Sequence, residues 1–150
     1  MARYNYNWKT LESGYLDDEG RLKLELIEDE ADKIGELLAR GGINKEIRYE
    51  KLSSSQLRRF YNEVKALDAK IDKDNFHENL PFILMLKAKA NYAYRGGGRQ
   101  KKIPESFKDF IIKNVEVVSR ERNFESFKKF TIFFETVVGY FYGHGGEVNR

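Results

Sequence analysis

The sequence contains no cysteine, and this absence excludes disulfide bonds and thiolate metal sites. It contains only two prolines, so little in it interrupts helices. No apolar run approaches the roughly 20 residues that span a bilayer, and the first residues lack the apolar core of a signal peptide. We therefore expect a cytoplasmic protein in a reducing compartment, with no membrane contact.

Signals for catalysis are also missing. The two histidines have no cysteine and no suitably spaced carboxylate that would complete a metal site. No serine lies in a nucleophile elbow, and the triplet Gly96–Gly98 lacks the Gly-Lys-Ser/Thr ending of a P-loop. The sequence thus predicts a protein that is not an enzyme and has no catalytic residue, metal site or cofactor.

Charge is close to balance overall, at +3, but it is unevenly distributed. Residues 1–36 hold ten acidic and five basic side chains, a net charge of −5, whereas residues 37–150 hold fourteen and twenty-two, a net charge of +8. This asymmetry predicts an acidic leading segment and a basic body that carries the function.

Apolar residues recur at helical spacing and predict a mainly α protein, a compact five-helix bundle that forms a single domain over residues 1–150. Gly41 ends the first helix, Ser53 and Gln56 cap the second, Pro104 starts the fourth and Asn123 caps the last. The predicted helices run over residues 28–40, 53–71, 80–95, 104–118 and 124–142.

Residues 1–27 leave two structures open. The strict alternation of Arg21–Leu26 predicts a short strand, which would pair with Tyr15 and Leu16 across an acidic turn. The alternative is a flexible, extended arm that becomes ordered on a partner.

The last helix carries apolar side chains over about 200° of its circumference, more than a helix on the outside of a monomer needs. Such a helix either lies at the centre of the core or presents a second face to another subunit. The second alternative predicts self-association, with Phe133, Val137 and Tyr140 as interface candidates.

The stretch Leu80–Lys102 has no acidic residue and combines an apolar helix, two tyrosines and a glycine loop. Cations bind phosphates and aromatic rings pack on bases or sugars, so the stretch suits a nucleic-acid backbone. A helix end with a solvated basic loop is the simpler alternative. The same two interpretations apply to Arg58 and Arg59. The cations of the stretch are Lys87, Lys89, Arg95, Arg99, Lys101 and Lys102.

Three blocks of the sequence resemble the small subunit of type III-A (Csm-type) CRISPR effector complexes. Ser53–Phe60 reads SSSQLRRF, Leu86–Arg95 reads LKAKANYAYR, and Phe124–Gly146 carries spaced phenylalanines, a Phe-Glu pair and terminal glycines. The order and spacing of the blocks are those of the family. Two departures are the run Glu135–Phe141 and the extra loop residues Gly97 and Gly98.

The resemblance implies a non-catalytic helical subunit that stacks with other subunits along the channel holding the crRNA–target RNA duplex. At the matching positions it implies contact with RNA by Arg58, Arg59, Lys87, Lys89, Tyr92 and Arg95. The loop cations Arg99, Lys101 and Lys102 are added from this sequence alone. A structural helical module whose basic loop docks on an acidic protein partner is the alternative.

Overall fold

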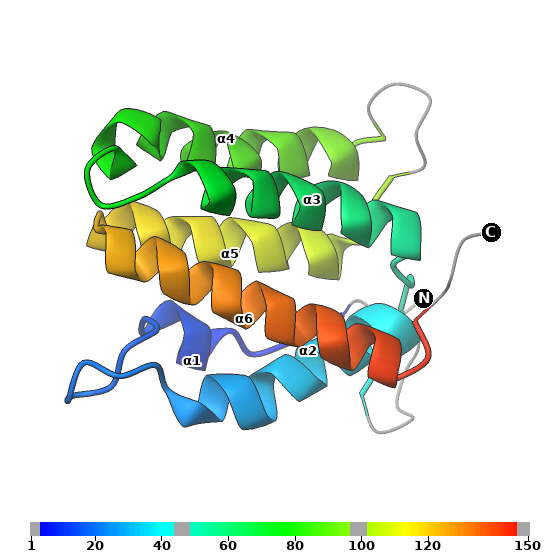
Figure 1. Ribbon diagram of the computed structural model, residues 1–150. Coiled ribbons are helices and arrows are strands. Elements are labelled where there is room, and N and C mark those ends of the chain that lie inside the picture. Colours follow the sequence, from blue (N-terminus) through cyan, green and yellow to red (C-terminus); the bar gives the residue numbers. More distant parts are fainter. Residues whose placement is uncertain (1–3, 44–48, 97–101, 147–150) are drawn as a thin grey trace.

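A computed structural model describes residues 4–43, 49–96 and 102–146 (Figure 1). Its named elements are all helical, and the predicted mainly α fold is confirmed. The five predicted helices are present, preceded by one short helix and a π-helical turn. In chain order the elements are α1 (Lys9–Glu12), η1 (Leu26–Glu30), α2 (Ala31–Arg40), α3 (Ser54–Lys70), α4 (Phe76–Tyr94), α5 (Glu105–Glu121) and α6 (Phe124–Gly143).

The long helices lie roughly side by side in a bundle (Figure 1). Helix α6 packs against α2, α3 and α5, and α4 packs mainly on α5. The helices α3 and α4 form the upper edge of the view in Figure 1, while α1 and α2 form the lower edge. Within the described segments, no helix is long and apolar enough to cross a membrane.

The predicted helix ends follow from their capping residues. The Ser53 hydroxyl accepts a hydrogen bond from the amide of Gln56, whose side chain accepts one in return from the Ser53 amide. The Asn123 side chain caps α6, and Gly41 ends α2 with a φ of 76°. The predicted start of α4 is wrong by four residues, because the helix already begins at Phe76, and Pro81 lies inside it.

Helix α6 lies at the centre of the core. Five of its six phenylalanines are completely buried, and Phe133 and Phe134 among them contact aromatic rings of α5 and Tyr15. The sixth, Phe124, is half-buried. The proposed interface residues Phe133 and Val137 are 0% exposed, so they have no exposed surface to lose on assembly. Of the three interface candidates, Tyr140 alone keeps partial exposure. The wide apolar face is therefore explained by packing within the chain.

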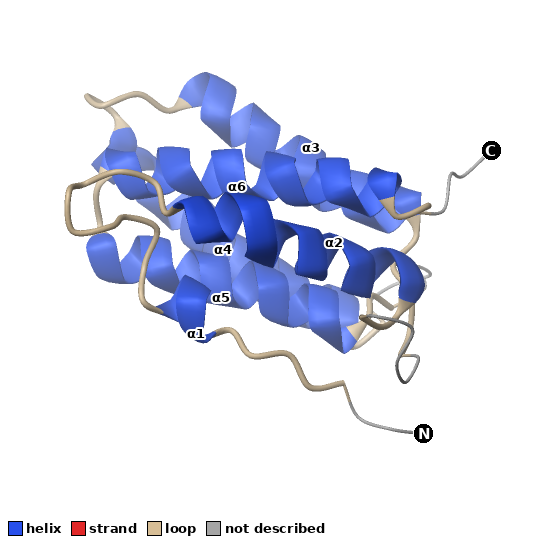
Figure 2. Ribbon diagram, turned by 90° about the horizontal axis from the view of Figure 1, so that it is seen from below, coloured by secondary structure: helices blue, strands red, loops and turns tan. Residues whose placement is uncertain are grey.

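The N-terminal segment packs against the helices instead of extending away from them (Figure 2). Trp8, Leu11 and Tyr15 are buried. The predicted pairing across the acidic turn is present, because an antiparallel bridge joins Leu16 to Leu22. The predicted extent of the strand is wrong, since helical structure already begins at Leu24. A strand would place Leu24 on the same face as its alternating neighbours, whereas its side chain is 71% exposed.

Candidate nucleic-acid interface

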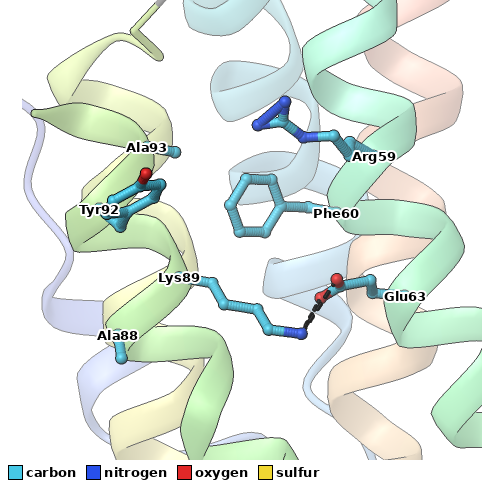
Figure 3. Close-up of a pocket in the computed structure, with 7 residues that line it drawn as sticks. All are labelled: Arg59, Phe60, Glu63, Ala88, Lys89, Tyr92 and Ala93. Carbon is cyan, nitrogen blue, oxygen red and sulfur yellow. Dashed lines mark hydrogen bonds and ion pairs between the residues drawn. The ribbon is translucent and has the colours of Figure 1, made fainter. Parts of the chain in front are cut away.

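A groove separates α3 from α4 near the C-terminal end of α4 (Figure 3). Its volume is about 360 Å³. The α4 wall carries two alanines, whose small side chains leave space opposite the longer side chains of α3. The lining residues are Arg59, Phe60, Glu63, Ala88, Lys89, Tyr92 and Ala93.

The floor of the groove is apolar and fixed by the core. Phe60 is 4% exposed and packs edge-to-face on Phe107 of α5, with 5.4 Å between ring centroids. Ala93 beside it is also buried. The floor is thus held by core packing and does not depend on loops.

The rim of the groove is charged. The Lys89 ammonium reaches across from α4 to the Glu63 carboxylate on α3, at 3.0 and 3.2 Å from its two oxygens (Figure 3). The Arg59 side chain is exposed and has no hydrogen-bond or ion-pair partner among the described residues. Tyr92 is 64% exposed, so its ring is accessible from solvent.

Two further predicted cations lie at the same end of the bundle. Arg95 follows the last residue of α4 and is exposed. The backbone of Lys102 connects the two helices, because its carbonyl accepts a hydrogen bond from the Gln56 side chain of α3 at 3.0 Å. The next residue, Ile103, donates its amide to the Ala93 carbonyl of α4 at 3.2 Å. The Lys102 backbone therefore lies next to the α3–α4 groove, while its ammonium lies 6.0 Å from the ring centroid of Tyr94.

The structure separates the remaining candidates from this groove. The Arg58 guanidinium donates to the Tyr142 hydroxyl of α6 at 3.2 Å, on another side of α3. Lys87 forms an ion pair with Glu116 of α5 at 3.2 Å, on another side of α4. Two residues on a helix that are two positions apart point about 200° away from each other, which is why Lys87 and Lys89 diverge. Arg99 and Lys101 lie outside the described residues.

Several residues of the site are not predicted from the sequence. Phe60, Glu63, Ala88 and Ala93 line the groove, and the helical period does place Phe60 and Glu63 on one side of α3. A second hollow between α4 and α5, with a volume of about 550 Å³, is lined by Lys87 together with Arg120 and Arg122. No sequence signal joins these two arginines to α4, because their proximity depends on tertiary packing.

Among the described residues, no group of three or more histidine, cysteine, aspartate or glutamate side chains is placed to hold a metal ion.

The fold and the groove define a small helical protein with a cationic, partly aromatic surface at one end. The chain belongs to the Csm2 Type III-A family, whose family model matches residues 21–147. No curated protein and no solved structure matches the chain.

Family membership confirms the resemblance of the sequence blocks and extends it toward the N-terminus. The chain is accordingly a small α-helical subunit of the multi-subunit type III-A Csm complex of CRISPR systems, and its partners include other Csm subunits. The Csm2 family is a structural family of that complex and is not known as a catalytic one.

Proposed function

We propose that the chain is a non-catalytic subunit that contacts the backbone of crRNA and target RNA within the type III-A complex, in the company of other copies of itself. The observation that carries the proposal is the convergence of cations from α3, α4 and the segment after α4 beside one groove. Arg59 and Lys89 line the groove, and Tyr92 supplies an exposed ring there. Arg95 follows α4 at the same end, and the Lys102 backbone contacts α3.

Such a surface binds RNA without reading its sequence. Phosphate contacts by lysine and arginine depend on charge and shape, while guide–target pairing supplies the sequence information. The ion pair between Lys89 and Glu63 is compatible with this role. Both side chains are well exposed, at 48% and 40%, and exposed pairs contribute little stability, so a phosphate can replace the carboxylate as the partner of Lys89.

The test is RNA affinity as a function of salt concentration for the wild type, Arg59→Glu, Lys89→Glu and Arg95→Glu, in the full chain and in the assembled complex. Each lost phosphate contact should flatten the log–log slope by roughly 0.7 on a single strand or about 0.9 on a duplex. Lys33→Glu on α2 is the matched control, because it makes the same charge change on the other side of the bundle (Figure 1).

If the three variants bind RNA as the control does, the cations form only a solvated surface, and docking on an acidic protein becomes the better explanation.

The non-catalytic part of the proposal has its own test. Purified chain incubated with RNA and divalent metal ions should leave the RNA intact. Cleavage that disappears when one of the chain's own carboxylates is changed would overturn it.

A further inference from the structure

We infer that the α3–α4 groove holds one unstacked nucleobase of the bound RNA, in addition to the phosphate contacts at its rim. This inference rests on the function proposed above and adds the chemical group that the groove accepts. The groove is the hollow lined by Arg59, Phe60, Glu63, Ala88, Lys89, Tyr92 and Ala93.

The apolar floor is the first reason. Phosphate binding needs cations and no hollow, yet a hollow of about 360 Å³ lies between the two helices here. The apolar side chains of Phe60, Ala88 and Ala93 line this hollow. Ligand sites are typically concave and mostly apolar, with a few polar groups that orient the ligand, so an apolar hollow on a rigid floor favours an apolar, flat guest.

The groups at the edge of the groove are the second reason. The Tyr92 ring is exposed at the rim and offers a face for stacking, which is tolerant of base identity because every base has a π-face. Arg59 and Lys89 donate hydrogen bonds, and the Glu63 carboxylate accepts them. A groove with both donors and acceptors suits the polar edge of any base, in keeping with a subunit that does not select sequence.

The positive charge around the groove favours a nucleotide over an apolar protein side chain as its occupant. A base in the groove is attached to a ribose and its phosphates, and cations lie close enough to the groove to bind these phosphates. Arg59 and Lys89 border the groove itself, while Arg95 and Lys102 lie at the neighbouring helix end. An apolar side chain of a protein partner would gain nothing from these charges.

The experiment fills the groove without changing any charge. Ala88→Phe adds a ring to an exposed α4 position that lines the groove. Ala69→Phe is the matched control, because it adds the same ring to an exposed α3 position outside the groove lining. Both variants and the wild type are titrated, as full chain and in the assembled complex, with oligouridylate and with the same backbone carrying abasic riboses.

The wild type should bind oligouridylate roughly 5- to 150-fold more tightly than the abasic RNA, the range that stacking on one aromatic side chain gives. Ala88→Phe should reduce this ratio to near one, whereas Ala69→Phe should keep it. Equal affinity of the wild type for both RNAs would overturn the inference.

The proposed function can fail or survive separately. If the abasic RNA binds as tightly as oligouridylate while Arg59→Glu still weakens both, the phosphate contacts stand and the base site does not. If no salt-dependent RNA binding is found in the chain or the complex, both proposals fall. If Ala88→Phe instead blocks assembly with other Csm subunits in the absence of RNA, a protein occupies the groove and the inference is wrong.

Discussion

Tyr15 forms a buried side-chain hydrogen bond between the N-terminal segment and α5. Its hydroxyl donates to Oδ1 of Asn114 at 2.6 Å, and both residues are completely or almost completely buried. The Asn114 amide nitrogen donates in turn to the Phe110 carbonyl at 2.8 Å, which fixes the orientation of the amide. Burial raises the pKa of the Tyr15 phenol well above its usual range, so the hydroxyl keeps its proton and remains a donor.

Changing Tyr15 to phenylalanine should lower the free energy of unfolding by about 1–3 kcal/mol, because the Asn114 oxygen would then be buried without a donor. Denaturant unfolding measures this loss. Tyr61→Phe is the control, since the Tyr61 hydroxyl donates to Glu135 at the surface, and its loss should cost less than about 0.5 kcal/mol. Equal effects of the two substitutions would contradict the account of a buried, specific bond.

Tyr92 and Tyr94 show how far single residues were predictable. Their separation by two positions predicts that one ring faces the core and the other faces away. The structure makes Tyr94 the half-buried ring, with the Lys108 ammonium 4.5 Å from its centroid, and leaves Tyr92 exposed at the groove. The spacing alone does not predict which of the two rings faces the core, because this depends on where α3 and α5 pack against α4.

At the level of elements, α2 and α6 approach each other closely at Gly35. A Cβ atom at this position would lie 2.6 Å from the Cβ of Tyr140 and 2.8 Å from the backbone nitrogen of Phe141. Real Cβ atoms do not come so near backbone atoms, so the helices would have to move apart. The absence of a side chain at Gly35 therefore sets the distance between two core helices.

Gly35→Ala should destabilise the protein by roughly 1–3 kcal/mol, although alanine favours helix by about 1 kcal/mol over glycine. Gly139→Ala tests the opposite case, because Gly139 lies in α6 with nothing within 4 Å of an added Cβ. That variant should be more stable than the wild type by about 0.5–1 kcal/mol. Thermal or denaturant unfolding of the two variants measures whether each substitution raises or lowers the free energy of unfolding. Stabilisation by both substitutions would show that α2 and α6 separate readily.

The elements were predictable where local chemistry determines them. Ser53 and Asn123 cap helices because their side chains accept hydrogen bonds from amides a turn further on, and this pattern is visible in the sequence. The start of α4 is harder to predict, because a proline is typical of a first helical turn, whereas Pro81 lies inside the helix and the buried Phe76 begins it. The groove was not predictable, since it depends on how α3 and α4 pack, which neither helix encodes alone.

At the scale of the whole molecule, two tyrosines fasten the N-terminal arm to the helices. The Tyr4 hydroxyl donates to Asp109 of α5, and the Tyr6 hydroxyl donates to Glu30 of η1. The arm continues into Trp8, which is 6% exposed and packs near Phe110. The prediction left open whether this segment needs a partner for order, and the described part of it is packed on its own chain.

These bonds predict a loss of stability at high pH. Burial, followed by the hydrogen bond to a carboxylate, raises the pKa of both Tyr4 and Tyr6 well above the value of about 10 that tyrosine has when unfolded. Above pH 10 the unfolded chain therefore releases these protons while the folded chain keeps them. The stabilisation is complete below pH about 10 and is lost as the pH rises toward the folded-state pKa.

The comparison that isolates this effect is the unfolding free energy between pH 9 and 11 for the wild type and for the double variant Tyr4→Phe/Tyr6→Phe. Lysines titrate in the same range, but they do so in both proteins and cancel in the difference. The wild type should lose stability more steeply, by less than the ~1.4 kcal/mol per pH unit that each fully protected proton gives, because both rings are partly exposed. Tyr92→Phe is the control, since the Tyr92 hydroxyl has no hydrogen-bond partner among the described residues. Parallel curves for the wild type and the double variant would mean that the tyrosine–carboxylate bonds do not hold the arm in place, and the arm would then depend on Trp8 and Leu11 for its attachment.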